Sequence, residues 1–288
     1  MLKKRIIGVL VVKNRWVVQS IKFERYLPVG HLDIAVEYLN RWGIDEIVIL
    51  DIDATYERRS PNFSMIQSAS NFSQTPLSVG GGISSLLDIE SLLRVGVDKV
   101  VINSQLISNP TLIKEGAYQF GSQCMVASID AIKVGNDYKV YDRANKKTDL
   151  KITELAKRVE DYGAGEIFLN SVERDGKKIG LDLQLASEVR ESVSIPIILC
   201  GGVGKPSDLV DGAKSNIDAV AAGNFFHFTE MSVVTSKQYM LRNDCSVRLD
   251  SYATYSKAIF DRFTERPTKL SEDKLEKLRF EYIPEEKI

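Results

Sequence analysis

Eight short apolar runs, spread between residues 6 and 223, are the main pattern along this chain. The apolar residues within each run are continuous, which is typical of strands covered on both faces, as in a parallel sheet. Between the runs, apolar residues recur at helical spacing. One such helical face consists of Ile34, Ala35, Tyr38, Leu39 and Trp42. Eight strands alternating with helices predict a single (β/α)8 barrel of the α/β class. The predicted strands are 6–12, 46–52, 76–79, 99–103, 124–130, 166–170, 196–200 and 219–223.

Several features recur at a fixed distance of 120 residues. They include glycines that follow helices, where a left-handed residue ends a helix without strain, and polar or glycine pairs that follow strands. This repeat predicts two duplicated half-barrels of four βα units each, and a duplicated half implies a duplicated ligand subsite. The repeated pairs are Gly43 with Gly163, Gly96 with Asn216, Gly81–Gly82 with Gly201–Gly202, and Asn103–Ser104 with Gly223–Asn224.

Composition narrows the class of protein. The 288 residues carry 38 basic and 39 acidic side chains, a net charge of −1 that argues against a nucleic-acid partner. The cysteines Cys124, Cys200 and Cys245 form no CxxC pair, and the only histidines are His31 and His227, so we predict no metal centre and no cofactor. The first apolar run is too short for a membrane span, and we expect a cytoplasmic protein without a membrane partner.

Glycine and polar residues follow the predicted strands at the end of a barrel where active sites lie. Glycines let backbone N–H groups approach an anion closely, so one cluster in each half suits a ligand with two phosphates. The alternative is that these glycines only form tight turns. Acidic residues also lie here, each able to act as a general acid or base or to anchor a loop. They are Asp51, Asp53, Asp130 and Asp175.

A series of motifs resembles the HisF-type cyclase subunit of imidazole glycerol phosphate synthase, in order and over residues 1 to about 250. The resemblance implies a barrel with a glutaminase subunit docked on its N-terminal face as a heterodimer. It also implies a phosphorylated small molecule at the C-terminal face and a path for ammonia between the two. The motifs are MLKKRII, GIDEIVILDIDA, SVGGGI, VDKVVINS, NPTLI, FGSQ, SIDA, GAGEIFLNSVERDG, GGVGK and FFHF.

The same resemblance implies roles for individual residues. Asp130 takes the position of the catalytic aspartate on strand five, and Asp98 that of a contact with the glutaminase. The charged ring that gates ammonia corresponds to Arg5, Glu46, Lys99 and Glu166; the alternative is an ordinary ion-pair network. The phosphate-binding clusters correspond to Gly81, Gly82, Asn103 and Ser104 in one half and Asp175, Gly176, Gly201, Gly202, Gly223 and Asn224 in the other.

Two positions depart from the family. Val11 stands where the family has its second catalytic aspartate, and Gln19 stands where it has a lysine near phosphate. Because valine cannot transfer a proton, formation of imidazole glycerol phosphate is in doubt. The chain is more similar to a branch associated with surface polysaccharide genes, which acts with a glutaminase and a sugar amidotransferase to place an acetamidino group on a sugar.

Three functions therefore stay open. The first is an ammonia-conducting barrel subunit of such a sugar amidation complex. The second is a working cyclase of histidine biosynthesis, since Asp130 and both phosphate clusters are present. The third is a non-catalytic scaffold that activates the glutaminase.

Residues 251–288 form a charged extension beyond the predicted barrel domain of residues 1–250. Their pattern predicts one helix from about Glu272 to Arg279 and a second around Tyr255 to Phe263. The extension either packs on the outside of the barrel or docks a partner protein.

Overall fold

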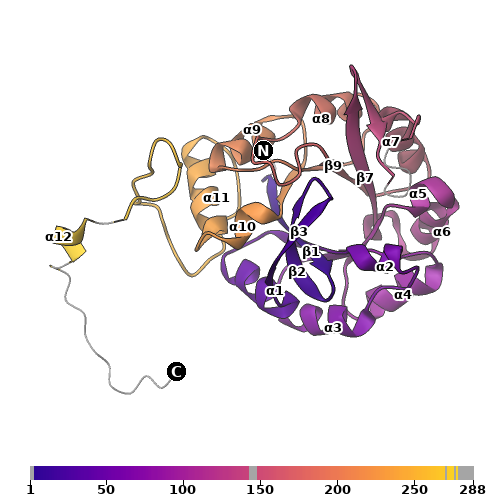
Figure 1. The fold of residues 1–288 in the computed structure, drawn as a ribbon, viewed down its shortest axis with the longest axis horizontal. Helices are drawn as coiled ribbons and strands as arrows, with labels where there is room; N and C mark the ends of the chain where they lie inside the picture. Colours follow the sequence, from indigo (N-terminus) through magenta and orange to yellow (C-terminus); the bar gives the residue numbers. More distant parts are fainter. Residues whose placement is uncertain (1–2, 143–147, 270, 276, 278–288) are drawn as a thin grey trace.

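Eight parallel strands close into a barrel in the computed structural model, which describes residues 3–142, 148–269, 271–275 and 277 (Figure 1). Strand β1 (Arg5–Lys13) pairs with β4 on one side and with β11 on the other, and this last pairing closes the ring. The predicted (β/α)8 barrel is thus confirmed, and strand ends differ from the predicted ones by at most four residues. The remaining barrel strands are β4 (Glu46–Asp51), β5 (Leu77–Gly80), β6 (Lys99–Ile102), β7 (Met125–Val134), β9 (Glu166–Ser171), β10 (Ile197–Cys200) and β11 (Ala219–Ala222).

Helices surround the barrel (Figure 1). Side-chain caps start several of them: Ser85 accepts a hydrogen bond from the backbone N–H of Asp88, and Asp182 accepts one from that of Leu185. The long helices are α1 (Leu32–Arg41), α3 (Phe63–Phe72), α4 (Leu86–Arg94), α6 (Thr111–Phe120), α7 (Ile152–Asp161), α8 (Leu183–Arg190), α9 (Pro206–Lys214) and α11 (Ser232–Arg242). Shorter turns of helix are α2 (Ile52–Tyr56), α5 (Gln105–Ser108), η1 (Ser122–Cys124) and α10 (Asn224–His227).

One helical face differs from the sequence interpretation. On α1 the buried residues are Leu32, Val36 and Leu39, whereas Ile34 and Tyr38 are about half exposed. The apolar residues of this helix therefore occupy more than one face, because the barrel covers only the side that carries Val36.

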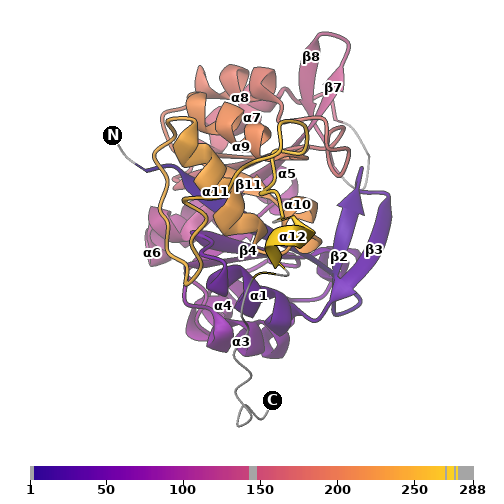
Figure 2. The same cartoon turned by 90° about the vertical axis from the view of Figure 1, so that its left-hand side faces the viewer.

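Two antiparallel hairpins extend the barrel at its C-terminal end, and the sequence interpretation did not include them. β2 (Trp16–Ile21) and β3 (Arg25–Gly30) continue from β1, and β8 (Asp137–Val140) pairs with the far end of β7. The hairpins project on the same side of the molecule, away from the N-terminus (Figure 2). They occupy equivalent places in the two half-barrels, one after the first strand of each half.

Alternation along the strands divides the core into two parts. Side chains facing outward pack under the helices and form the larger cluster, and those facing inward fill the barrel. The interior cluster consists of Ile7, Val9, Val48, Val101, Val126, Phe168, Ile198, Cys200, Ala219 and Ala221. A mostly apolar column therefore connects the two ends of the barrel.

The helix predicted around Tyr255 to Phe263 is absent, and the segment instead forms a tight turn. The Asp261 carboxylate accepts hydrogen bonds from the backbone N–H groups of Phe263 and Thr264, which satisfies donors locally in competition with a helix. Phe260 pairs with Pro267 below this turn. A short α12 (Glu272–Leu275) begins where the last helix was predicted, and three of that helix's residues, 276, 278 and 279, lie outside the described part.

None of the described helices is both long enough and apolar enough to cross a membrane.

Candidate functional site

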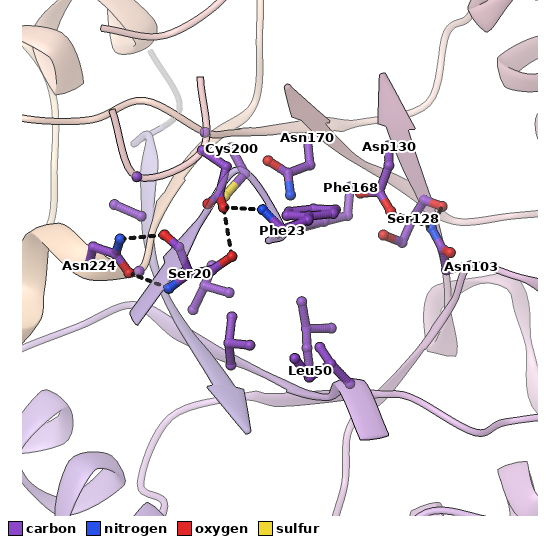
Figure 3. A pocket seen from close by; sticks show the side chains of 18 of the residues that line it. Ser20, Phe23, Leu50, Asn103, Ser128, Asp130, Phe168, Asn170, Cys200 and Asn224 are labelled. Carbon is purple, nitrogen blue, oxygen red and sulfur yellow. Dashed lines mark hydrogen bonds between the residues drawn. The ribbon is translucent and has the colours of Figure 1, made fainter. Parts of the chain in front are cut away.

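A pocket opens at the C-terminal ends of the barrel strands, where the sequence placed the candidate chemistry (Figure 3). Every barrel strand, or the loop that follows it, contributes to the lining. Ten of the predicted site residues line this pocket: Gly81, Asn103, Ser104, Asp130, Asp175, Gly176, Gly201, Gly202, Gly223 and Asn224.

Asp130 ends an inward-facing series on β7 that begins with Val126 and Ser128. The Asn103 side-chain amide donates to the Asp130 carboxylate over 3.1 Å and to the Ser128 carbonyl oxygen over 2.9 Å. This holds Asp130 and Asn103 together across neighbouring strands. A carboxylate held at the top of the barrel can accept a proton or orient a ligand hydroxyl or amine.

The wall on the strand-one side of the pocket is apolar. Val9, Val11 and Leu50 face the cavity from β1 and β4. Val11 and Asp130 line the same pocket, from β1 and β7. Of the other acids in the lining, Asp51 forms a two-point ion pair with Arg59 at 2.8 and 3.1 Å.

Gln19 is absent from the pocket lining, and its neighbour Ser20 faces the cavity. Alternation along β2 explains this difference, because successive side chains point to opposite faces of a strand. The hairpin therefore presents Ser20, Phe23 and Tyr26 to the pocket.

Gly82 lies in a second, polar cavity next to the first. Gly81, Asn103 and Ser104 contribute to both cavities. Only glycine fits at position 82, since its φ is +72° and a Cβ atom there would lie 2.3 Å from the Arg59 carbonyl oxygen. The sequence interpretation missed the polar residues of the α2 and α4 loops that line this cavity, although each follows a strand: Thr55, Arg58, Arg59, Ser60 and Ser84.

The β2–β3 hairpin covers the pocket and is fastened by two predicted site residues. The Asn224 amide donates to the Ser20 carbonyl oxygen over 2.7 Å and accepts from the Ser20 backbone N–H. The Asp175 carboxylate accepts from the Ser20 hydroxyl at 2.6 Å and from the Phe23 N–H at 3.3 Å. These side chains thus hold the hairpin at the pocket.

The tip of this hairpin is strained. Lys22 and Phe23 both have positive φ, 54° and 59°, a conformation that bulky residues rarely adopt. Phe23 meets Tyr141, from the segment after β8, with ring centroids 6.0 Å apart. The two halves of the barrel therefore touch across the pocket, and contacts from both stabilise the strained tip.

Burial sets the protonation of several groups here. It raises the pKa of Asp175 above its usual range, although hydrogen bonds from Ser20 and from the backbone favour the charged form. Burial also raises the pKa of the Cys200 thiol, which argues against Cys200 as a nucleophile. It lowers the pKa of His227, on α10, to about 4. No group of three His, Cys, Asp or Glu residues in the described ranges is arranged to hold a metal ion.

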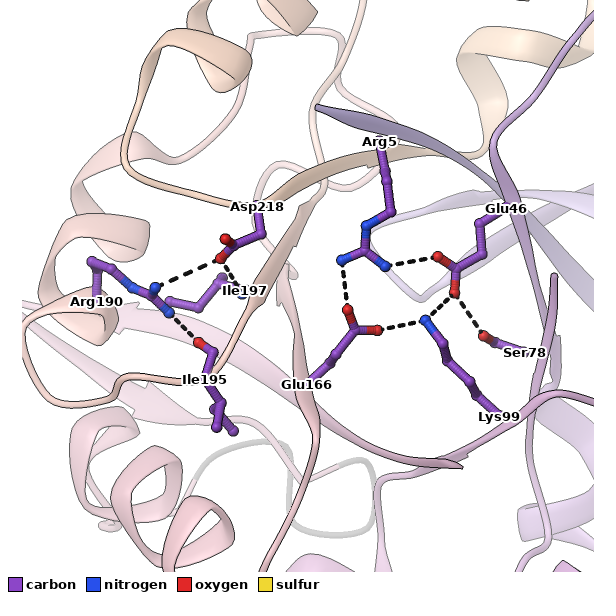
Figure 4. A network of polar contacts seen from close by, with 9 residues as sticks. All are labelled: Arg5, Glu46, Ser78, Lys99, Glu166, Arg190, Ile195, Ile197 and Asp218. Atoms are coloured by element: carbon purple, nitrogen blue, oxygen red, sulfur yellow. Dashed lines mark hydrogen bonds and ion pairs between the residues drawn. The ribbon is translucent and has the colours of Figure 1, made fainter. Parts of the chain in front are cut away.

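The opposite end of the barrel carries a closed ring of alternating charges (Figure 4). Arg5 pairs with Glu46 at 2.9 Å and with Glu166 at 2.5 Å. Lys99 completes the ring, pairing with Glu46 at 2.7 Å and with Glu166 at 2.8 Å. The four predicted gate residues are thus in direct contact, each on a different strand.

Neighbouring charges shift the pKa of Lys99 and that of Glu166 toward the charged form. Burial alone would lower the pKa of Lys99, but the two carboxylates outweigh it and raise the pKa. For Glu166, burial would raise the pKa, and the hydrogen bond and charge of Arg5, with Lys99, lower it instead. Opposite charges therefore hold the starts of four barrel strands together.

Asp98 is exposed beside this ring, and its carboxylate accepts a hydrogen bond from the Leu77 backbone N–H at 2.8 Å. Asp45 and Asp218 make the same contact with Ile6 and Ile197. Asp98 therefore holds the first residue of β5 in place.

Comparisons with known proteins identify relatives that cover most of this chain. The family model described as "Histidine biosynthesis protein" matches residues 5–232. A protein of Vibrio vulnificus (strain YJ016), provisionally named imidazole glycerol phosphate synthase subunit hisF2, is 44% identical over 269 residues, which cover 93% of this chain and 98% of that protein. The imidazole glycerol phosphate synthase subunit HisF of Dehalococcoides mccartyi (strain ATCC BAA-2100 / JCM 16839 / KCTC 5957 / BAV1) is 42% identical over 254 residues, 87% of this chain and 100% of that protein. HisF of Bacillus cereus (strain G9842) is 44% identical over 252 residues, 86% and 100% respectively.

Proposed function

Because this chain belongs to the histidine biosynthesis protein family and is HisF-like, we propose that it is the barrel subunit of a glutamine-dependent amidotransferase. In this function a glutaminase docks on the N-terminal face and releases ammonia, which crosses the barrel toward an acceptor. The acceptor is a sugar that gains an acetamidino group for a surface polysaccharide, in a cytoplasmic complex with a sugar amidotransferase.

One observation carries the proposal: the charged ring is complete at one end, while the pocket at the other end has Val11 rather than an acid on β1. Arg5, Glu46, Lys99 and Glu166 form four ion pairs. Across the barrel, Val11 faces the pocket that holds Asp130. A chain with this pattern is suited to conducting ammonia and poorly suited to acid–base catalysis by a carboxylate pair on β1 and β7.

The interior suits a small neutral molecule. Ammonia needs only a brief opening of the ring, since it carries no charge and forms few hydrogen bonds. The column beyond the ring is lined by side chains such as Val48, Val126 and Phe168, which would oppose entry of ammonium or hydroxide because both are charged. Asp130 and Asn103 are the first paired polar side chains above this column.

The second candidate is the cyclase of histidine biosynthesis. It is favoured by Asp130 in the pocket and by glycines of both half-barrels in the pocket lining. The third, a scaffold that only activates the glutaminase, would leave the pocket without a ligand.

Deleting the gene tests these functions together. We expect the deletion strain to grow without histidine and to lose the acetamidino group from its polysaccharide, measured by NMR of the purified polymer. A gene carrying Lys99→Leu should restore less of the group than the wild-type gene. Histidine auxotrophy, or an unchanged polymer, would contradict the proposal.

An assay of the purified chain separates conduction from cyclisation. With ammonium and the ribonucleotide substrate of imidazole glycerol phosphate synthase, we expect product at least about 100-fold below that of a two-aspartate cyclase, the loss typical of a missing general acid or base. A Bacillus cereus HisF protein is the control. Turnover equal to that of the control would favour the cyclase.

A further inference from the structure

The C-terminal extension crosses the outside of α11, and its residue Glu265 reaches the start of α9 (Figure 2). We call residues 250–268 the strap. Its contacts with the barrel begin where the Ser251 hydroxyl meets the Arg41 carbonyl oxygen. Farther along, Arg242 donates to the Ser256 carbonyl oxygen at 2.7 Å, and Phe260 packs on Tyr239 with ring centroids 5.6 Å apart.

The turn above Phe260 places Glu265 against the start of α9. Glu265 is only 8% exposed, and its carboxylate accepts a hydrogen bond from the Ser207 backbone N–H at 2.7 Å. Its φ is +56°, a strained value for a residue with a side chain. The Asp261 carbonyl oxygen holds it there by accepting from the Glu265 N–H at 3.0 Å.

The internal repeat allows the start of α9 to be compared with the start of α4, its counterpart in the first half-barrel. In the first half-barrel, α4 is capped by its own Ser85, whose hydroxyl accepts from the Asp88 N–H at 3.2 Å. The residue 120 positions later, Lys205, begins α9 and has no oxygen to offer. Asp88 and its counterpart Asp208 both accept from the loop N–H groups before their helices, so this part of the cap is retained. The Asp208 N–H, the counterpart of the Asp88 N–H, donates instead to the Lys205 carbonyl oxygen at 3.1 Å. The strap supplies a side-chain acceptor one residue earlier, where Glu265 accepts from the Ser207 N–H.

The loop before α9 is the glycine loop of the second anion cluster. It runs from Gly201 and Gly202, in the pocket lining, to Lys205. The loop is fixed at one side by the Gly180 N–H, which donates to the Gly202 carbonyl oxygen at 2.9 Å. Its other side is held at the start of α9. There the Asp208 carboxylate accepts a hydrogen bond from the Lys205 N–H, and the Glu265 carboxylate accepts one from the Ser207 N–H.

We propose that Glu265 is a positioning residue, which caps α9 from the strap and thereby sets the anion affinity of the Gly201–Gly202 loop. The inference rests on the phosphate clusters of the proposed function. The hydrogen bond from the Ser207 N–H to Glu265 contributes more to stability than the ion pair of Glu265 with Lys205. That ion pair spans 3.5 Å, and the Lys205 side chain is 54% exposed. The Vibrio relative, which matches 93% of this chain against 86–87% for the HisF proteins, is where a strap of the same kind is expected.

The test uses the full-length chain, labelled with ¹⁵N at glycine, and inorganic phosphate as the probe. Glu265→Ala should weaken phosphate binding, followed at the Gly202 and Gly223 amides, by about fivefold, the size expected for a lost cap. Binding followed at Gly82 should not change. Glu265→Gln keeps an oxygen acceptor and should stay within about twofold of wild type.

Ser85→Ala is the matched control, because it removes the side-chain cap at the start of α4, the helix of the first half that corresponds to α9. It should weaken binding at Gly82 and leave Gly202 unchanged. Hydrogen exchange of the Ser207 amide, followed in a uniformly ¹⁵N-labelled sample, provides a readout without phosphate, and it should quicken in Glu265→Ala alone.

Equal affinities at Gly202 in Glu265→Ala and wild type, with both proteins folded by circular dichroism, would overturn the proposal. So would a loss of affinity at both clusters, which would indicate general destabilisation. Wild-type protein that binds no phosphate at Gly202 would refute the second phosphate site and this role of Glu265. Faster Ser207 exchange in the variant would then still establish the cap, so the two failures are distinguishable.

Discussion

Asp175 holds the tip of the β2–β3 hairpin through both its side chain and its backbone. Its carboxylate binds the Ser20 hydroxyl and the Phe23 N–H, and its carbonyl oxygen accepts from the Lys22 N–H. The two strained residues of the hairpin tip are therefore held by a single residue. His227 is the contrasting case, since burial lowers its pKa and its Nε2 atom has no hydrogen-bond partner among the residues that the structure describes.

His227 should make the stability of the protein depend on pH. Its folded pKa of about 4 lies below the ordinary value of 6.5, so the unfolded chain binds the proton first as the pH falls. Stability from this residue is complete above pH 6.5 and is lost toward pH 4, by about 2 kcal/mol between pH 7.5 and 5. Urea unfolding at the two pH values measures it, and His227→Phe should remove that part of the change. The exposed His31, replaced by Phe, is the control, and an equal effect of both substitutions would contradict the assignment.

At the level of elements, equivalent strand ends in the two half-barrels share a backbone conformation. Gly81, after β5, has a φ of +108°, and Gly201, after β10, one of +102°. Their surroundings differ, since a Cβ at Gly81 would lie 2.0 Å from the Asp51 carbonyl oxygen, and at Gly201 2.8 Å from that of Ser171. The repeat thus preserves the turn, while the tolerance for a side chain differs between the halves.

Gly81→Ala should destabilise the protein more than Gly201→Ala does. Both substitutions strain the backbone, by about 1–3 kcal/mol, and Gly81→Ala must also displace a backbone oxygen. Thermal unfolding of the two variants measures the difference. Gly30→Ala is the control, because position 30 has an ordinary φ and open space, and it should change the melting temperature little. A larger effect at Gly201 than at Gly81 would show that β4 moves to make room.

Across the whole molecule, two polar ends are separated by an apolar column. The charged ring lies at the start of the strands, and the pocket lies at their ends. Inward positions on β9 illustrate this order: Glu166 in the ring, Phe168 in the column and Asn170 in the pocket. The same strands therefore connect the place where ammonia would enter with the place where it would be used.

Lys99→Leu should uncouple the two ends in a complex reconstituted with the glutaminase and the sugar amidotransferase. Leucine removes one of the two cations that balance Glu46 and Glu166, so the ring can no longer close in the same way. We expect the ratio of amidated sugar to released glutamate to fall severalfold, while free ammonium still supports amidation. Lys157→Leu is the control, since Lys157 also pairs with two acids but lies on the outer face of α7. An unchanged ratio would make the ring a structural ion-pair network.

The linear sequence determined the barrel and the ends at which its polar residues lie. Continuous apolar runs indicate strands covered on both faces, and parallel strands place the residues that follow them at one end. Asp130, Asn103 and Gly202 could be assigned to one pocket for this reason, and the repeat gave each half a glycine cluster. The linear sequence also identifies Val11 as a departure from the family, because this chain and the family's motifs can be compared position by position.

Only the tertiary structure decided which side chains those positions contact. The segment around Tyr255 to Phe263 has a helical pattern but forms a turn held by Asp261. Ile34 is exposed because the barrel covers another face of α1. Asp175 and Asn224 hold a hairpin that begins more than 150 residues earlier, and Glu265 caps a helix 58 residues before it. Such contacts depend on how distant segments meet in space, and periodicity reports only on residues a few positions apart.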